Sequence, residues 1–523
     1  MTAVAPTLAT SPPPPSRARL PSGVAVLVGV LGVAAALAAG HLVAGVLNPN
    51  ASPFVAVGNT AIDLAPAPVK EFAIRAFGPA DKLVLIGGMG VVLLGFAVVA
   101  GLLSRRGPWP GTVFAVVLGG LGAGAVLARP DLGPVDLLAP AASLVVGAVA
   151  FRWLHASAVR RGAGGGRAGG EGTSADRRRF LVMSAGLAAG AGVAGAGGQL
   201  LAGREDSRAV LGPLTPVTPA PPIAAGADFA SLGTPRFITA NRDFYRVDTA
   251  LSVPRVRAED WALRVHGAVD DEVVLRYADV RRMPLVERTV TLTCVSNEVG
   301  GTYVSTSNFI GVPLRELLGR AGVKAGADQL FATSVDGWTS GTPVADVLDR
   351  GLLAIGMNGQ PLPSEHGFPA RLVVPGIYGY ASAAKWVVDL ELNRFTDKQS
   401  YWLTRGWAKF APIKTQSRID VPAAFATVPA GGVSVAGIAY AQHRGIAKVE
   451  VRVDEGPWLT AELATEVNLD TWRMWRAEVD LAPGPHTVEC RATDRTGATQ
   501  TADRVPPIPD GATGWHSAQF TVQ

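Results

Sequence analysis

The stretch of this sequence best suited to chemistry is Thr289-Val-Thr-Leu-Thr-Cys-Val-Ser-Asn-Glu-Val-Gly-Gly301. It holds Cys294, one of only 2 cysteines in 523 residues, after a run in which threonines alternate with apolar residues as in a β-strand. The glycine pair then predicts a loop, so the thiol is expected where a strand ends, a frequent place for functional side chains. A thiolate there would suit a transition metal. The other interpretation is a buried cysteine that packs as a small hydrophobic residue.

Composition excludes several classes of protein. The two cysteines, at 294 and 490, lack the CxxC spacing of zinc or redox sites and cannot form a disulfide framework. The net charge is +5, but many arginines lie beside hydrophobic spans and the soluble part has no basic-aromatic stripe, which argues against nucleic-acid binding. Apolar residues are concentrated in the N-terminal part, which indicates a membrane portion followed by a soluble portion.

The N-terminal part predicts a disordered tail and five membrane helices. Residues 1–21 are rich in proline, serine and threonine, a composition typical of disorder. Five apolar spans follow, each long enough to cross a bilayer core about 30 Å thick. The spans are 22–47, 82–103, 109–128, 135–154 and 180–202. Glycine and alanine dominate them, which predicts close helix packing through small residues.

Basic residues predict the orientation of these spans. They precede the first span, follow the second, and separate the fourth from the fifth, so five spans would place all of them on one side of the membrane. The positive-inside rule assigns that side to the cytoplasm and the soluble part to the extracytoplasmic face of the cell membrane. These residues are Arg17, Arg19, Arg105, Arg106, Arg152, Arg160, Arg161, Arg167, Arg177, Arg178 and Arg179.

A candidate export signal lies within this basic region. The motif Asp176-Arg-Arg-Arg-Phe-Leu181 resembles a twin-arginine export signal, which carries folded proteins. The alternative is an ordinary positive-inside cluster.

The remainder predicts a linker and two folded domains. Residues 204–226 contain several prolines and favour an extended spacer. Residues 227–414 mix short strands with helical patches, which indicates an α+β domain. Residues 415–523 contain five or more short alternating strands split by turns, which predicts an immunoglobulin-like β-sandwich. The predicted fold is therefore multidomain: an α-helical membrane region, an α+β domain and a β-sandwich.

Several motifs follow one another in the soluble part. They are Phe237-Ile-Thr-Ala-Asn-Arg-Asp-Phe-Tyr245, Thr293-Cys-Val-Ser-Asn297, Asp336-Gly-Trp338, His366-Gly-Phe-Pro-Ala-Arg371, Val374-Pro-Gly376, Lys385-Trp386, Tyr401-Trp402, Arg418-Ile-Asp-Val-Pro422 and Thr471-Trp-Arg-Met-Trp475. In this order and spacing, the chain from about residue 227 onward resembles the sulfite-oxidase-like family of molybdopterin-dependent oxidoreductases. The resemblance implies a catalytic α+β domain and a C-terminal domain through which two copies form a homodimer.

The resemblance also implies a site. Cys294 would be the single protein ligand to molybdenum, completed by two pterin sulfurs and oxo groups. The implied pterin contacts are Asn241, Phe244, Tyr245, Asp336, His366, Arg371, Ala383, Ala384 and Lys385. The residue types suit this role, because a guanidinium can fork onto a phosphate and a lysine adds a point charge. Each also has an ordinary interpretation: His366 as a loop histidine, for example, and Arg371 as a surface salt bridge.

One departure from the family concerns the substrate. Sulfite oxidases place an arginine a few residues after the metal cysteine, where this chain has Glu298, Val299 and Gly300. Arg242 and Arg405 are the remaining candidates for catalytic residues that hold an anion. Because a carboxylate repels an oxyanion, a sulfoxide-type reductase competes with a sulfite-type dehydrogenase.

We therefore expect a membrane-anchored molybdenum-pterin oxidoreductase that transfers an oxygen atom, in a two-electron reaction, to or from a small sulfur-containing substrate outside the cytoplasm. The sequence shows no haem-binding domain beside the catalytic one, so a separate cytochrome or quinone-linked partner is expected to exchange the electrons. The alternative function is a non-catalytic membrane protein whose outer domain keeps the fold and binds partners.

Overall fold

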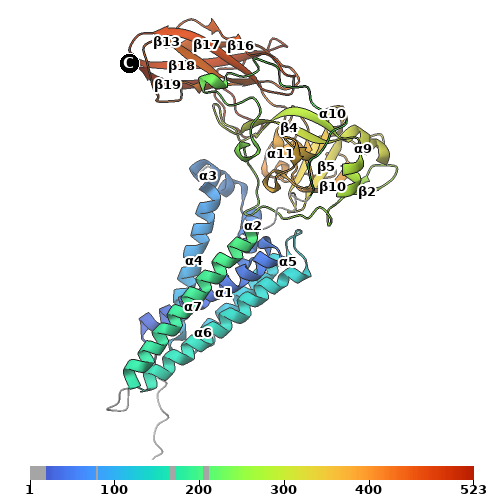
Figure 1. Cartoon of the computed structure of the whole chain (residues 1–523). Coiled ribbons are helices and arrows are strands. Elements are labelled where there is room, and N and C mark those ends of the chain that lie inside the picture. The colour runs from blue at the N-terminus through green and yellow to red at the C-terminus, as the bar shows by residue number, and fades with distance from the viewer. Residues whose placement is uncertain (1–18, 78–79, 165–171, 204–210) are drawn as a thin grey trace, which may run out of the picture. The chain divides into compact units, whose positions relative to one another are not determined.

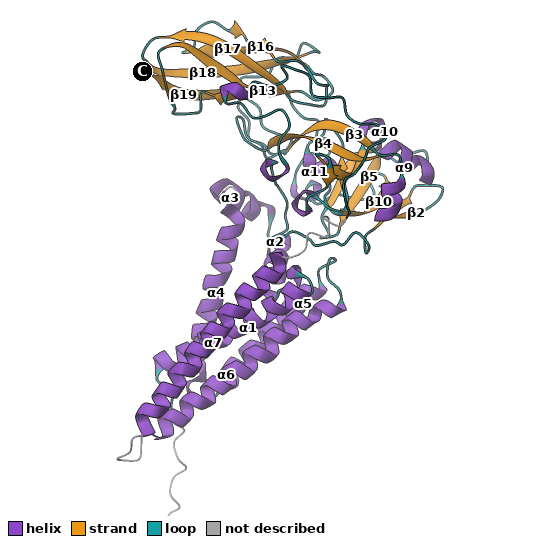
Figure 2. Ribbon diagram, in the orientation of Figure 1, coloured by secondary structure: helices purple, strands orange, loops and turns teal. Residues whose placement is uncertain are grey.

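The computed structural model describes residues 19–77, 80–164, 172–203 and 211–523. The chain divides into two compact units, Met1–Glu205 and Asp206–Gln523. Within the described residues, the first unit is helical and the second carries the β-sheets (Figure 1, Figure 2). The predicted disordered tail lies almost entirely outside the described residues, as does the start of the predicted linker.

The first unit contains long apolar helices. Its helices are α1 (Ser22–Val46), α2 (Pro53–Leu64), α3 (Ala67–Phe77), α4 (Asp81–Leu103), α5 (Trp109–Leu127), α6 (Leu138–Gly164) and α7 (Gly172–Gly203). Four stretches of the described chain are long and apolar enough to cross a membrane: Ser22–Val46, Asp81–Arg106, Trp109–Leu127 and Pro134–Arg160. They correspond to the first four predicted spans. The fifth predicted span is helical, but its described apolar part, Val182–Gly198, is shorter. The helices α2 and α3 are not among the predicted spans.

Small residues bring the helices of this unit close together, as their composition predicts. A Cβ atom at Gly29 of α1 would lie 2.1 Å from the carbonyl oxygen of Ala97 on α4. A Cβ atom at Gly45 would lie 2.5 Å from the carbonyl oxygen of Gly198 on α7. The backbones therefore approach too closely for any side chain at these two positions.

The α+β domain is built on two sheets. The first has the strand order β2-β1-β10-β5-β6, and the second has the order β3-β4-β7-β8, with β9 paired to β7. The strands are β1 (Ala262–Gly267), β2 (Val273–Arg276), β3 (Val286–Thr293), β4 (Val304–Pro313), β5 (Gln329–Ser334), β6 (Thr339–Pro343), β7 (Leu352–Met357), β8 (Gln360–Pro361), β9 (Arg371–Val373) and β10 (Val387–Asn393). The helices are α8 (Tyr277–Arg282), α9 (Leu314–Ala321), α10 (Val344–Arg350) and α11 (Gly379–Ser382).

Local sequence explains these elements. In α9, Leu314, Leu317, Leu318 and Ala321 are buried, a spacing that gives a helix one apolar face. The helix ends at Gly322, whose φ of 68° is left-handed and suits glycine. The mixture of sheets and short helices agrees with the predicted α+β class.

The C-terminal domain, residues 415–523, contains two further sheets. One has the order β11-β13-β17-β16 and the other β12-β19-β18-β14-β15. The strands are β11 (Gln416–Val421), β12 (Thr427–Val428), β13 (Gly431–Tyr440), β14 (Ile446–Val453), β15 (Leu459–Thr460), β16 (Glu462–Leu463), β17 (Arg473–Leu481), β18 (Gly484–Asp494) and β19 (His516–Val522). Side chains from both sheets, such as Val435, Trp475 and Cys490, form one core. The all-β prediction agrees with this; the immunoglobulin-like class stays a prediction.

The two domains of the second unit also share a core. Ile438, Tyr440, Trp472 and Met474 of the C-terminal domain belong to the buried cluster of the α+β domain. The indole Nε1–H of Trp472 donates to the carbonyl oxygen of Phe237 at 3.1 Å. The two domains are therefore packed against each other as one body, without a linker between them.

Candidate functional site

Cys294 lies directly after β3, where the alternating pattern predicts the end of a strand. Its backbone N–H donates to the carbonyl oxygen of Tyr303 at 3.0 Å, and its own carbonyl accepts from Asn297 N–H at 3.1 Å. The thiol sulfur lies 2.9 Å from the hydroxyl of Ser296. Cys294 is half-buried, whereas Cys490 is fully buried. The accessible thiol is therefore the one at the strand end.

The surroundings of Cys294 control its ionisation. Withdrawal from water raises the pKa of the thiol, while hydrogen bonds from Ser296 and the positive charge of Lys385 act in the opposite direction. The thiol consequently remains protonated at neutral pH unless a cation replaces the proton. A metal ion would do so, because thiolate ligands lose their proton on coordination.

A buried guanidinium, Arg371, lies at the start of β9. The side chain is 5 % exposed; its Nη1–H donates to the carbonyl oxygen of His366 at 3.1 Å, and its guanidinium lies 5.6 Å from the centre of the Phe309 ring. No carboxylate among the described residues forms an ion pair with it. Burial lowers the pKa of Arg371 to about 10. This cation is thus buried against carbonyl groups and an aromatic ring, without an anion.

A second buried cation, Lys385, lies beside Arg371. Its Nζ is 3.1 Å from Asp248 Oδ2 and 3.1 Å from the carbonyl oxygen of Glu365. Burial lowers the pKa of Lys385 to about 8, although Asp248 partly opposes the shift. The same carboxylate also pairs with Arg246 at 2.8 Å. One carboxylate therefore serves two cations, and the cluster that includes Arg371 keeps a positive charge.

Gly367 allows these two cations to approach each other. Its φ is +112°, and a Cβ atom there would lie 3.0 Å from the Cβ of Arg371 and 3.1 Å from the Cβ of Lys385. Both the conformation and the space favour glycine at this position. The motif that runs from His366 to Arg371 thus folds back, and Arg371 lies close to Lys385, although Lys385 follows Arg371 by fourteen positions in the sequence.

His366, Phe244 and Tyr245 form the aromatic part of the site. His366 Nε2 lies 2.9 Å from the carbonyl oxygen of Asn241; a carbonyl only accepts, so this nitrogen carries the proton. The Phe244 ring lies 5.4 Å from the rings of both His366 and Tyr245. Burial lowers the pKa of His366 to about 4, so its imidazole is neutral at neutral pH. Burial raises the pKa of Tyr245, so its hydroxyl stays protonated and available as a donor.

The start of α11 links Tyr245 to the strand that carries the thiol. A Cβ atom at Gly379 would lie 3.8 Å from the Tyr245 hydroxyl and 3.8 Å from the carbonyl oxygen of Thr293. Ala383 and Ala384 follow this helix, and the carbonyl of Ala384 accepts from Leu372 N–H in β9 at 2.8 Å. The predicted segment 383–385 therefore runs beside β9, next to Arg371.

Asn241 has a structural partner within the same region. Its side-chain oxygen accepts from Asn358 Nδ2 at 2.8 Å, and its side-chain amide donates to the carbonyl of Met357 at 3.4 Å. Both contacts fix the 3-10 helix Asn241–Asp243, which precedes Phe244 and Tyr245. A role for Asn241 toward a pterin stays a prediction.

Local contacts hold three other predicted residues. Asp336 lies in the turn between β5 and β6 and accepts from Trp338 N–H at 3.2 Å. The Arg242 side chain is 88 % exposed and lies 3.5 Å from Asp243. Arg405 donates to the carbonyl of Tyr401 at 2.7 Å and stacks at 3.6 Å from the centre of that ring. The functions predicted for these residues stay predictions.

Sequence reasoning missed two residues that contact the site. Asp248, the counterion of Lys385, precedes it by 137 positions, and nothing in its neighbourhood of the sequence marks it. Ser296, which contacts the thiol, lies within the quoted motif Thr293-Cys-Val-Ser-Asn297. A hydroxyl two positions after a candidate metal ligand is a signal that could have been used.

A second group of metal-ligating side chains lies on the other sheet. Ligand atoms of His266, Asp389 and Glu391, on the paired strands β1 and β10, all lie within 4.8 Å of one another. His266 is bonded to Asp389 at 3.0 Å, and Lys398 forms an ion pair with Glu391. The three groups are therefore satisfied by protein partners, and we assign no metal to them.

Comparisons with known proteins place this site in context. A family model described as "Oxidoreductase molybdopterin binding domain" matches residues 250–402. Mouse (Mus musculus) mitochondrial sulfite oxidase is 31% identical over 326 residues, which are 53% of this chain and 59% of the relative. The uncharacterized oxidoreductase YuiH of Bacillus subtilis (strain 168) is 33% identical over 148 residues, which are 28% of this chain and 72% of the relative.

Among solved structures, the sulfane dehydrogenase SoxCD of Paracoccus pantotrophus is similar, with a TM-score of 0.49 and 23% identity, over 54% of this chain and 81% of that chain. The chain spans about three fifths (59%) of the length of the mouse sulfite oxidase that it matches. The range matched by the family model contains Cys294, Arg371 and Lys385 but begins after Tyr245.

Proposed function

We propose that this chain, which belongs to the sulfite-oxidase-like family of molybdopterin-dependent oxidoreductases, binds molybdenum–molybdopterin and catalyses two-electron oxygen-atom transfer on a small sulfur-containing substrate. One observation carries the proposal: a half-buried thiol lies within electrostatic reach of a buried cationic cluster that has fewer anions than cations. A buried charge without a counterion is destabilising, and an anionic ligand would offset that cost.

The residues of the cluster fit a phosphorylated pterin. Arg371 presents a planar fork of donors that suits a phosphate, and Lys385 adds a point charge next to it. The Tyr245 hydroxyl, held protonated by burial, adds a neutral donor. When bound, the cofactor would supply the two-electron redox chemistry and the exchangeable oxygen atom. The chain's own residues would bind it, orient it and exclude water from it.

Cys294 would act as the protein ligand to the metal. The raised pKa of its thiol means that metal binding must release the proton, so loading would become easier as the pH rises. Ser296, 2.9 Å from the sulfur, would donate a hydrogen bond to the thiolate and so limit its basicity.

The character of two charged residues, Glu298 and Arg242, favours an uncharged sulfoxide over sulfite as substrate. Glu298, four positions after Cys294, is exposed, and Arg242, a candidate anion holder, is 88 % exposed and paired with Asp243. An anionic substrate would gain little from an arginine that faces solvent and would be repelled by the carboxylate. Sulfite is the second candidate, favoured by the similarity to a sulfite oxidase.

The test is a metal and activity analysis of the full chain, purified in detergent from a host that makes the cofactor. We expect about one molybdenum per chain by elemental mass spectrometry, the stoichiometry of a single-ligand site. Turnover should be faster with a neutral sulfoxide and a reduced dye than with sulfite and an oxidised dye. Protein without molybdenum or pterin would contradict the oxidoreductase function and favour the partner-binding alternative.

The helical unit would anchor the enzyme in the cell membrane. Within this unit, two hydrogen bonds join Leu20, just before α1, to Arg105, just after α4. Leu20 N–H donates to the carbonyl of Arg105 at 3.0 Å, and Arg105 Nε donates to the carbonyl of Leu20 at 2.9 Å. Leu20 also packs with Leu154 and Ala158 near the end of α6. Basic residues that lie far apart in the sequence therefore belong to one end of the unit, which supports a cytoplasmic location for that end and an extracytoplasmic catalytic domain.

The export route can be tested at the start of α7. In the twin-arginine-like motif, the side chain of Arg178 is exposed, whereas those of Arg177 and Arg179 lie outside the described residues. Changing Arg177 and Arg178 together to lysine should leave the soluble unit inaccessible to added protease if twin-arginine export operates. Unchanged accessibility from outside would exclude that route.

The proposed partners complete this function. A separate cytochrome or a quinone-linked protein would exchange the electrons, and a homodimer would form through the C-terminal domain, which we assign to the immunoglobulin-like class because its two sheets share one core. We expect no nucleic-acid partner.

A further inference from the structure

The geometry points to a second role for the C-terminal domain: we propose that it positions the metal-ligating thiol, by holding residues 289–301 (the Cys294 segment) on both sides of Cys294. This inference rests on the proposed function, in which Cys294 binds molybdenum. The residues that we assign to this positioning role are Arg418, Tyr440, Gln442, Asn468 and Asp470.

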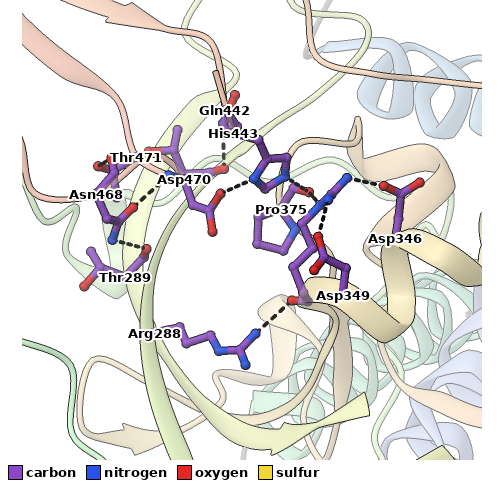
Figure 3. Close-up of polar contacts among 12 residues, drawn as sticks. Arg288, Thr289, Asp346, Asp349, Pro375, Gln442, His443, Asn468, Asp470 and Thr471 are labelled. Carbon is purple, nitrogen blue, oxygen red and sulfur yellow. Dashed lines mark hydrogen bonds and ion pairs between the residues drawn. The ribbon is translucent and has the colours of Figure 1, made fainter. Parts of the chain in front are cut away.

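The first set of contacts covers the open edge of β3. Among the strands of its sheet β3 pairs only with β4. Thr218 bridges the other edge at Val286, and the rest of that edge presents backbone groups that need partners. The N–H of Thr291 donates to the carbonyl of Asp470 at 3.0 Å, and the carbonyl of Thr291 accepts from Gln442 Nε2 at 3.0 Å. The carbonyl of Thr289 accepts from Asn468 Nδ2 at 3.1 Å (Figure 3). The C-terminal domain thus supplies the partners that a neighbouring strand would otherwise provide.

The same turn of the C-terminal domain reaches two further parts of the site. Trp472 N–H donates to the buried hydroxyl of Thr291 at 2.8 Å. Its indole donates to the carbonyl of Phe237 at 3.1 Å, at the start of the motif that ends in Tyr245. One turn therefore connects the strand that carries the thiol with the segment that carries the aromatic residues.

This turn is itself fixed between the domains. His443 Nδ1 lies 2.6 Å from Asp470 Oδ1, and His443 Nε2 lies 2.7 Å from the carbonyl of Pro375 (Figure 3). A Cβ atom at Gly376 would lie 2.2 Å from His443 Nε2, so the imidazole packs directly on that backbone. Asp470 N–H also donates to the Asn468 side chain at 2.8 Å. The turn cannot shift without breaking these contacts.

A second set of contacts holds the loop after the thiol. Arg418 Nη1 donates to the carbonyl of Gly301 at 2.8 Å, and Asn297 Nδ2 donates to the hydroxyl of Tyr440 at 3.3 Å. Asn297 also accepts from Tyr303 N–H at 2.8 Å, so it joins both sides of the loop to the C-terminal domain. At Gly300 a Cβ atom would lie 2.2 Å from His516 Nε2, which leaves no room between this loop and β19.

These two sets of contacts flank the thiol. Thr291 precedes Cys294 by three residues and Asn297 follows it by three, and each is held by the C-terminal domain. Contacts from residues that do not themselves bind the metal can orient a metal ligand and tune its reactivity. Removing the C-terminal domain would therefore release the Cys294 segment, so a deletion after residue 415 would disturb metal binding as well as dimerisation.

The test compares two arginines of the C-terminal domain in metal-free full-length chain. Arg418 donates to a carbonyl of the Cys294 segment, whereas Arg473 donates to the carbonyls of Ala464 and Ile446 within its own domain. Alkylation of each cysteine by iodoacetamide is followed by peptide mass spectrometry, together with hydrogen exchange of residues 294–301. Arg418→Ala should speed alkylation of Cys294 by about tenfold, as the loss of a hydrogen bond from a charged group allows, and should speed exchange in this loop.

Arg473→Ala should leave both rates at Cys294 unchanged, and Cys490 should stay unreactive in both variants. Equal Cys294 rates in the two arginine variants would overturn the positioning role. Because Arg418→Ala leaves Asp420 buried without its partner and so risks the fold, Tyr440→Phe serves as the milder variant. It removes one hydroxyl, and we expect a smaller increase in the same two rates; no change there would count against a contribution from Tyr440.

A molybdenum readout separates this inference from the proposed function. In cofactor-loaded protein, Tyr440→Phe should keep the metal but shift its Mo(V) electron paramagnetic resonance spectrum, whereas Tyr277→Phe, which removes a hydroxyl that has no hydrogen-bond partner among the described residues, should not. Wild-type protein without molybdenum would refute the proposed function. If cofactor-loaded Tyr440→Phe gives the wild-type spectrum, the positioning role is refuted while the proposed function stands.

Discussion

Cys294 and Cys490 are the same residue type in two different surroundings. Cys294 follows the last residue of β3, is half-buried, and lies next to Ser296 and within electrostatic reach of Lys385. Cys490 lies within β18, is 0 % exposed, and packs among apolar side chains of two sheets. Burial raises the pKa of Cys490 to about 12, and no cation among the causes of that shift opposes it.

The difference shows what makes a thiol available for metal binding. A residue in the middle of a strand is fixed by backbone hydrogen bonds to the neighbouring strands on both sides, whereas a residue at the end of a strand is followed by a loop. Only at Cys294 does the described chain add nearby positive charge, which favours the thiolate. Cys490 is an ordinary buried cysteine of the kind that the alternative interpretation of Cys294 described.

The largest expected effect separates the two thiols. Cys294→Ser should reduce turnover to background and strongly reduce molybdenum content, because a hydroxyl is a harder and more weakly acidic ligand than a thiol. The fold should persist, which circular dichroism and gel filtration can check. Full activity in this variant would show that the Cys294 thiol is not needed for metal binding, so the difference between the two thiols would have no role in function.

A tenfold to hundredfold effect is expected from the cation beside Gly367. Arg371→Lys keeps the charge but loses the planar fork, so the retained pterin and molybdenum should fall by about 10–100-fold. Arg473→Lys, in the C-terminal domain, is the matched control and should retain the cofactor. Equal retention of pterin and molybdenum in both variants would show that Arg371 does not bind the phosphate.

The pH dependence gives a subtler effect. In the cofactor-free chain, burial lowers the pKa of Lys385 from its ordinary 10.5 to about 8, so the unfolded chain binds more protons than the folded chain between these values. The contribution of Lys385 to the free energy of unfolding of metal-free protein should therefore rise with pH between about 8 and 10.5. Over the same range the contribution of Lys385 to the affinity for the anionic cofactor should fall, because binding at this group then requires uptake of a proton.

The control for this dependence is Lys385→Met, which has no titratable group. Stability and cofactor binding, measured by chemical unfolding and pterin fluorescence, should lose that part of their pH dependence. A wild-type profile that the substitution leaves unchanged would show that Lys385 is not the titrating group.

The smallest expected effect on function comes from the second thiol. Cys490→Ala leaves a small cavity between the two sheets and should lower the free energy of unfolding by about 1–2 kcal/mol. Molybdenum content and turnover per folded molecule should remain at the wild-type level. A loss of metal comparable to that of Cys294→Ser would show that metal binding depends on Cys490 as much as on Cys294.

The sequence predicts the place of Cys294 because the signal is local. Alternation of threonines with Val290 and Leu292 defines β3, and the pair Gly300 and Gly301 defines the loop. The motif around His366 and Arg371 is equally local, and its glycine explains how the chain reverses there. In the same way, apolar composition predicts four long helices of the first unit.

The rest depends on contacts between distant residues. Asp248 pairs with Lys385 across 137 positions, and Asn468 bonds to Thr289 across 179. Charge alone made Arg242 a candidate anion holder, but its position on a short exposed 3-10 helix turns it to solvent. No periodicity or composition encodes such pairings, because they arise only when two elements dock.

The most direct test of the central claim is X-ray absorption at the molybdenum edge of the purified full chain, beside Cys294→Ser loaded to a measurable level. If Cys294 is the protein ligand, the wild-type spectrum should require one more sulfur neighbour than the variant spectrum. Identical sulfur coordination in the two proteins would contradict the claim and would require a different residue to hold the metal.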